Sequence, residues 1–249
     1  MKKYGKSLFV LAASLIILLA VIIFNKNFEK EQHTVNTVTD TNTENITELT
    51  TAYDTQPDFF HEPVSESLQK YMDSKSYTAN GDITFDSLRH VVVKYIDFEG
   101  NTKSGELIVN INVADEVVEI FRELYAASYA IEKINLIDDY NGNDEASMED
   151  NNTSCFNYRK IDGQETLSDH SYGLAIDINP LYNPYIRTNM GDRNVLPVNA
   201  VDFADRTSDF PHKITKEDTC YKIFSKYGWK WGGEWDSPVD YQHFYKEIR

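Results

Sequence analysis

An apolar run near the N-terminus limits what this 249-residue chain can fold into more than any other feature. Three lysines precede the run, and from Leu8 to Phe24 only Ser14 interrupts it. A stretch of about this length can cross a bilayer as a helix, and lysines on its N-terminal side keep that end in the cytoplasm. Residues 1–24 are therefore excluded from any water-soluble core, and the rest of the chain is predicted to be extracytoplasmic.

The residues after the run bear on whether it is an anchor or a cleaved signal. The run ends in Ile-Ile-Phe-Asn-Lys, which lacks the small residues of a signal-peptide cleavage site. No cysteine that could be lipidated follows it. We therefore expect a single-pass anchor in the cell membrane, with a cleaved signal as the alternative.

Residues 25–56 are rich in Thr, Asn and Glu and contain few large apolar side chains. Such a segment cannot bury enough surface to offset the entropy lost on ordering. It is predicted to be a disordered stalk between the membrane and a folded domain at residues 57–249.

The charge and cysteine content exclude some classes of function. A net charge of −16 argues against nucleic-acid binding, which needs a basic surface. Cys155 and Cys220 are the only cysteines, too few for a zinc site built from thiolates. An exported domain permits a disulfide between them, but two buried thiols fit the sequence equally.

The folded part has the pattern of an α+β domain, with β-branched runs and helical spacing of apolar residues in separate segments. The stretch 138–152 is polar and acidic and is predicted to be a long loop. Helices are predicted at 64–72, at 115–130 and between a capping signal at 215–218 and Gly228. Strands are predicted at 90–98, 106–113, 155–159, 173–178 and 241–248.

A first group of polar residues lies between Leu167 and Pro180. If residues 174–178 are extended, Asp177 points to the face opposite the apolar side chains, and a buried carboxylate needs a partner. A metal ion is one such partner, and His170 just before the strand could supply a nitrogen ligand. A capped turn at His170, with Asp177 bound to backbone amides, is an equal alternative.

A second group is an aromatic, glycine-bearing turn that leads to Asp240 and His243. A catalytic zinc takes three protein ligands and keeps one position open for water. His170, Asp177 and His243 form such a set, and Asp240 could then take a proton from the water. The three tryptophans of this segment are expected to pack as walls.

Arg159 lies shortly before the first group, in Phe-Asn-Tyr-Arg. An arginine here could hold a substrate carboxylate or stabilise a developing oxyanion. The alternative is a surface salt bridge.

These motifs, in this order, resemble those of the zinc peptidoglycan peptidases. The family includes D-alanyl-D-alanine carboxypeptidases and the L-alanyl-D-glutamate endopeptidases of phage endolysins. The similarity covers roughly residues 155–244. It rests on Tyr-Arg159, Ser168-x-His170-x-x-Gly-x-Ala-x-Asp177, Gly-Gly-x-Trp235 and Asp240-x-x-His243-Phe.

The resemblance implies an α+β domain, like that of the hedgehog and D-Ala-D-Ala peptidase proteins. Its small antiparallel sheet would carry the zinc site and be flanked by helices. His170, Asp177 and His243 would then be the zinc ligands. Asp240 would be the general base, and Arg159 would be both catalytic and substrate-binding. Ser168 matches a motif position and would have a supporting role in substrate binding.

One position departs from the carboxypeptidase branch of the family. That branch commonly has Glu-x-x-His, whereas this chain has Asp240-x-x-His243, which resembles the endopeptidase branch. Glu234 is a rival for the general base, but it lies outside the matched position.

The predicted function is hydrolysis of peptidoglycan stem-peptide bonds by a membrane-tethered zinc metallopeptidase. A non-catalytic wall-binding or signalling domain that keeps the peptidase fold is the alternative, and a peptidase for protein substrates stays open. The enzyme is favoured because all five implied ligand and catalytic positions hold competent residues.

Overall fold

The computed structural model describes residues 58–79, 83–188 and 191–248. The predicted membrane anchor and stalk, residues 1–56, lie outside the described residues. Within the described ranges, no helix is long and apolar enough to span a membrane.

A long antiparallel hairpin is the largest sheet element of the domain. In its first strand, the alternating residues Val91, Val93 and Tyr95 are buried, as the period of a strand requires. The turn is closed by Asp97, whose Oδ1 accepts hydrogen bonds from the backbone of Glu99 and Asn101. A third strand adds to the outer edge, so that the order is β1 (Phe60–Pro63), β2 (Leu88–Ile96), β3 (Thr102–Asn110).

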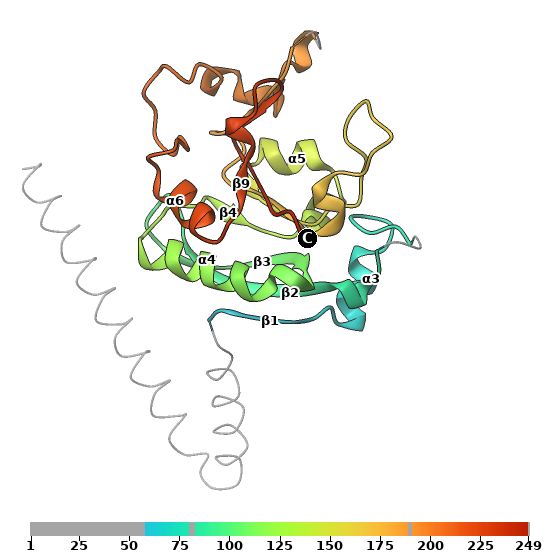
Figure 1. Cartoon of the computed structure of the whole chain (residues 1–249). Helices are drawn as coiled ribbons and strands as arrows, with labels where there is room; N and C mark the ends of the chain where they lie inside the picture. The colour runs from blue at the N-terminus through green and yellow to red at the C-terminus, as the bar shows by residue number, and fades with distance from the viewer. Residues whose placement is uncertain (1–57, 80–82, 189–190, 249) are drawn as a thin grey trace, which may run out of the picture. The chain divides into compact units, whose positions relative to one another are not determined.

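The helix α4 (Ala114–Ala126) covers this sheet and runs alongside β2 (Figure 1). Its buried residues recur at helical spacing and include Val117, Phe121 and Leu124. The same helix also packs against α6 (Thr219–Lys226), which joins the sheet to the C-terminal part of the domain. These contacts form one large core in which Ile176, Phe224 and Phe244 take part.

The strands that carry the candidate site are short. One antiparallel sheet has the order β6 (Ala175–Asp177), β11 (His243–Tyr245), β9 (Lys230–Trp231). A second has the order β10 (Val239–Asp240), β7 (Tyr185–Ile186), β8 (Val195–Leu196). A parallel pair is formed by β4 (Lys133–Ile134) and β5 (Asn152–Thr153). The predicted α+β class with small antiparallel sheets is confirmed.

Two further α-helices and seven short 3-10 helices connect these strands in the described part of the chain. The α-helices are α3 (Glu66–Met72) and α5 (Asp144–Glu149). The 3-10 helices are η1 (Phe85–Ser87), η2 (Ile111–Val113), η3 (Ile137–Tyr140), η4 (Asp169–Tyr172), η5 (Gly191–Arg193), η6 (Val198–Phe203) and η7 (Gly232–Glu234).

Three local predictions are wrong. The segment 138–152 is not a plain loop, because most of η3, all of α5 and the start of β5 lie in it. Residues 155–159 form no strand, because their backbone amides bond one at a time to separate segments. The helix α6 is capped by Asp218, whose Oδ1 accepts from the backbone N–H of Cys220 at 2.7 Å, and not by Thr215. Cys155 and Cys220 are free thiols, and both are buried.

Candidate metal centre

The pairing of β6 with β11 places two of the predicted ligands side by side. His243 is the register partner of Asp177, and their side chains lie on the same face because paired residues always do. The Nδ1 atom of His243 is 3.1 Å from Oδ1 of Asp177. Both side chains are buried.

The third predicted ligand, His170, comes from η4, which leads directly into β6. Ser168 caps η4 and accepts a hydrogen bond from the backbone N–H of His170 at 3.4 Å. Gly173 ends η4 with φ +66°, and a Cβ there would lie only 2.6 Å from the backbone nitrogen of Asn110. The close packing of Gly173 on β3 thus fixes where His170 stands.

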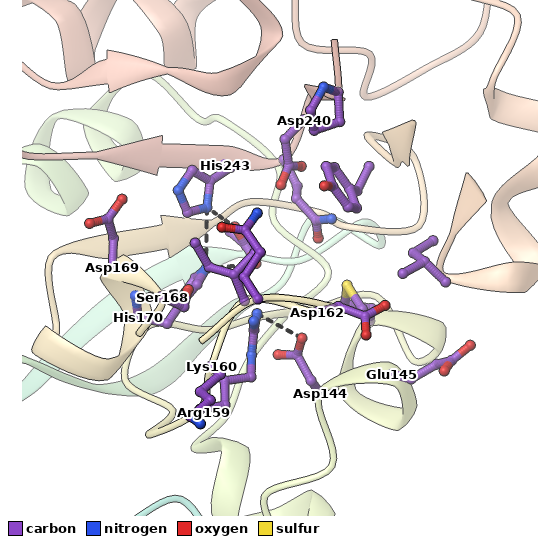
Figure 2. Close-up of a pocket in the computed structure, with 18 of the residues that line it drawn as sticks. Asp144, Glu145, Arg159, Lys160, Asp162, Ser168, Asp169, His170, Asp240 and His243 are labelled. Atoms are coloured by element: carbon purple, nitrogen blue, oxygen red, sulfur yellow. Dashed lines mark hydrogen bonds and ion pairs between the residues drawn. The ribbon is translucent and has the colours of Figure 1, made fainter. Parts of the chain in front are cut away.

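The ring of His170 is oriented by its own hydrogen bond. Nδ1 lies 2.6 Å from the carbonyl oxygen of Cys155, and since a carbonyl can only accept, Nδ1 carries the proton. Nε2, the other ring nitrogen, faces the other two residues. It is 3.2 Å from Nδ1 of His243 and 3.2 Å from Oδ2 of Asp177 (Figure 2).

Electrostatic interactions couple the ionisation of the three residues. Burial alone would raise the pKa of Asp177, but the imidazoles of His170 and His243 hold that pKa well below its ordinary value. Burial lowers the pKa of His170, yet the Asp177 carboxylate outweighs it and raises that pKa. The carboxylate is thus kept ionised in a buried place, where it needs positive charge beside it.

The donor set suits a divalent cation. The three residues offer ligand atoms that lie within 4.8 Å of one another, and they are the one such group among the described residues. Two imidazole nitrogens and one carboxylate oxygen are a common three-ligand set for catalytic zinc. Metal-binding histidines usually donate their second ring N–H to a carbonyl or carboxylate, as His170 does to Cys155.

A cavity of about 660 Å³ opens over this group. The predicted ligands form part of its wall, together with Arg159, Ser168 and Asp240. Ser168 is buried and its Oγ caps η4, and its part in substrate binding stays a prediction. Trp235 forms another part of the wall, with its ring centroid 5.5 Å from that of His243, as expected for a packing residue.

Asp240 projects into the cavity from β10 (Figure 2). Its Oδ1 is shielded from solvent and finds no hydrogen-bond partner among the described residues. Burial raises the pKa of Asp240 to about 7, even though the neighbouring His243 favours the ionised form. A carboxyl group in this state can take up or release a proton near neutral pH.

Glu234, the rival base, lies in different surroundings. Its Oε1 is 2.6 Å from Nζ of Lys216 and 3.3 Å from the hydroxyl of Tyr221, and its side chain is exposed. It is not among the described residues that line the cavity. These contacts favour Asp240 over Glu234 as the residue that exchanges protons there.

Arg159 forms an ion pair, as the alternative interpretation expected, but the pair lies in the cavity wall. Nη2 is 2.8 Å from Oδ2 of Asp144, and both residues line the cavity (Figure 2). Its backbone is held by Ser171, whose Oγ accepts from the N–H of Arg159 at 2.9 Å and donates to its carbonyl at 2.7 Å. The guanidinium is therefore near the candidate metal centre and not on the outer surface.

Some residues of the cavity wall were not predicted from the sequence. These residues come from α5, from the loop after Arg159 and from the β7–β8 region. No periodicity or spacing marks them, and α5 lies where a loop was predicted. They include Asp144, Glu145, Met148, Asp162, Tyr185, Arg193 and Leu196.

Comparison with known proteins gives one match. Residues 162–246 match a family model described as D-alanyl-D-alanine carboxypeptidase. No curated protein and no solved structure matches the chain. The matched range contains His170, Asp177, Asp240 and His243, whereas Arg159 precedes it. Over residues 162–246, the match confirms the resemblance predicted from the motifs.

Proposed function

We propose that this protein is a zinc metallopeptidase that hydrolyses stem-peptide bonds of peptidoglycan. The bond would be of the L-alanyl-D-glutamate or the D-alanyl-D-alanine type. The main support for the proposal is that His170, Asp177 and His243 lie together in the wall of one cavity. The family match to residues 162–246 supports peptidase chemistry there.

In this proposal, zinc would be held by Nε2 of His170, a carboxylate oxygen of Asp177 and Nδ1 of His243. When bound, the metal would lower the pKa of a water molecule and polarise the scissile carbonyl. The fold around it would be that of the hedgehog and D-Ala-D-Ala peptidases, with the zinc on the β6–β11 sheet.

The chain's own residues would then handle the proton and the developing charge. Asp240 accepts a proton from the attacking water and donates it to the amine nitrogen as the C–N bond breaks. Arg159 donates N–H groups to the carbonyl oxygen as it gains negative charge, or to a substrate carboxylate. The apolar wall formed by Trp235 and Met148 would keep bulk water away from these groups.

A wall-binding or signalling domain without catalysis is the competing function. It would have no use for Asp240, whose Oδ1 is shielded from solvent and makes no hydrogen bond within the described residues. Leaving a shielded carboxylate oxygen without a hydrogen-bond partner is costly, so a chemical role for Asp240 is the simpler account.

The test is mass spectrometry of purified muropeptides after incubation with the full-length protein and zinc. Loss of a terminal D-alanine identifies a carboxypeptidase, and a cut after L-alanine identifies the endopeptidase. A chelator should stop either reaction. Intact muropeptides that nonetheless bind to the zinc-loaded protein would favour the non-catalytic alternative.

We also propose that residues 1–24 anchor the protein in the cell membrane and that residues 25–56 form a stalk. The support is the apolar run and the missing cleavage site in the sequence. Cell fractionation tests this: the full-length protein should sediment with membranes. A mature N-terminus just after Phe24, with the protein in the medium, would contradict the anchor.

A further inference from the structure

The helix α5 begins with two acids that form ion pairs with two arginines of the cavity wall. Oδ2 of Asp144 is 2.8 Å from Nη2 of Arg159. Oε2 of Glu145 is 2.8 Å from Nη1 of Arg193. Only the first pair involves a residue with a role in the proposed reaction.

The start of α5 is held rigidly. Gly142 has φ +73°, and a Cβ there would lie 2.4 Å from the carbonyl oxygen of Lys75, so the turn packs directly on backbone. Asn143 then caps the helix by accepting from the N–H of Ala146 at 3.1 Å. The carbonyl of Gly142 also accepts from the side chain of Asn157 at 3.4 Å. The helix start is therefore tied to the segment that carries Arg159.

Arg159, by contrast, has a fixed backbone and a long side chain with few restraints. Ser171 holds its N–H and its carbonyl, but its Nε is shielded from solvent and has no hydrogen-bond partner among the described residues. In the described part of the chain, Asp144 is the one ion-pair partner of the guanidinium. Both side chains are about 70% buried, with 31% and 27% of their surfaces exposed.

We propose that Asp144 is a positioning residue that holds the guanidinium of Arg159 toward the reacting carbonyl. A carboxylate on one side of a guanidinium fixes its plane and leaves the remaining N–H donors aimed at the substrate. Asp144 itself does not touch the substrate. The inference rests on the proposed function, because it is Arg159 that acts in the reaction.

The main test is a double-mutant cycle on muropeptide hydrolysis. Asp144→Asn should lower kcat roughly 10- to 100-fold, the cost of misplacing a catalytic group, with KM and zinc content little changed. In an Arg159→Ala background the same substitution should have no further effect, because nothing remains to be positioned. Glu149→Gln is the matched control, since it removes the same charge from the exposed end of α5.

A second measurement does not depend on activity. In ¹⁵N NMR of the full-length protein, the Nη signals of Arg159 should show slow rotation in the wild type. They should average to one signal in Asp144→Asn. If the wild type cleaves nothing, the proposed function fails, and this measurement alone then decides whether Asp144 orders the guanidinium.

Two outcomes would overturn the inference. An equal loss of kcat from Asp144→Asn with and without Arg159 would mean that Asp144 acts on the substrate by itself, for example by accepting an ammonium group. Unchanged rotation of the Arg159 guanidinium in Asp144→Asn would mean that the ion pair does not hold it.

Discussion

His243 faces Asp177 across the β6–β11 pair, with 3.1 Å between Nδ1 and Oδ1. Sheet register creates this neighbour relationship, because a slip by one residue would turn one of the two side chains to the other face. The centre therefore depends on the packing of the sheet as a whole, including Phe244 in the core next to His243.

Replacing His170 by Ala should remove the metal and lower stability. The wild type is expected to bind about one zinc per chain, and loss of one of three ligands would leave Asp177 buried without enough positive charge beside it. Elemental analysis and thermal unfolding check this. His61→Ala is a control, because His61 pairs with exposed Asp115 outside the cavity. A folded, freshly purified wild type without stoichiometric metal would refute the metal assignment.

Asp240→Asn should keep both zinc and fold but lose most activity. An amide has nearly the same shape but cannot take the proton, and general-base catalysis contributes about 10²- to 10⁴-fold. Glu234→Gln, made in parallel, should change turnover little, since Glu234 is bound by Lys216 at the surface. The assignment of the base is wrong if Glu234→Gln is inactive while Asp240→Asn works. Loss of zinc from Asp240→Asn would instead make Asp240 a ligand.

Arg159→Ala should lower kcat about 10²-fold, comparable to removing an oxyanion donor. Zinc content should not change, because the guanidinium lies beside the centre and its one ion-pair partner among the described residues is Asp144. Steady-state kinetics and elemental analysis on the same preparation separate the two effects. Turnover equal to that of the wild type would reduce Arg159 to an ion-pairing residue.

Gly173→Ala should destabilise the protein more than Gly100→Ala. Both glycines have positive φ, +66° and +83°, so both substitutions carry a backbone strain of roughly 1–3 kcal/mol. Only at Gly173 would the added Cβ also meet backbone, 2.6 Å from Asn110 N, whereas at Gly100 nothing lies within 4 Å. Denaturant unfolding measures the free energy of unfolding of both variants. Equal losses would show that η4 can shift away from β3 at no cost.

Stability should depend on pH through His90. Burial lowers the pKa of His90, but Glu106 on β3 and Glu62 on β1 outweigh it and raise that pKa above 6.5. The contribution of protonated His90 to the free energy of unfolding is therefore complete below pH 6.5. It is lost as the pH rises through the pKa of His90 in the folded protein. His90 lowers the pKa of Glu106 below 4.5, so the contribution of Glu106 is complete above pH 4.5 and is lost on further acidification.

The comparison that checks this is the melting temperature of wild type against His90→Gln. The difference should be largest between pH 4.5 and 6.5 and smaller at pH 8. A difference that stays constant over this range would show that packing, and not the ion pairs, is what His90 contributes.

Much of the local structure could be predicted from the sequence. Alternation in β2 and helical spacing in α4 are properties of neighbouring residues, and both elements formed close to the expected positions. The grouping of His170 and Asp177 followed from the same kind of local pattern. Their meeting with His243 was predicted only through zinc chemistry and the family resemblance, because strand register is a long-range property.

Other features depend on contacts that no local pattern encodes. Residues 155–159 form no strand, because Phe156 bonds to Ile108, Asn157 to His170 and Tyr158 to Ser76, so they pair with no single strand. α5 is a short helix in an acidic segment whose composition also suits a loop. Its place in the cavity wall depends on the packing of Gly142 against Lys75.

The distance along the chain between the ligands sets the order in which the centre can form. His170 and His243 are 73 residues apart, with α6 and β9 between them. During synthesis, His170 and Asp177 emerge well before β11, and until then they lack both the third ligand and the strand that orders β6. The nascent chain should therefore stay inert toward its proposed substrate, since the same strand that completes the sheet also completes the candidate metal centre.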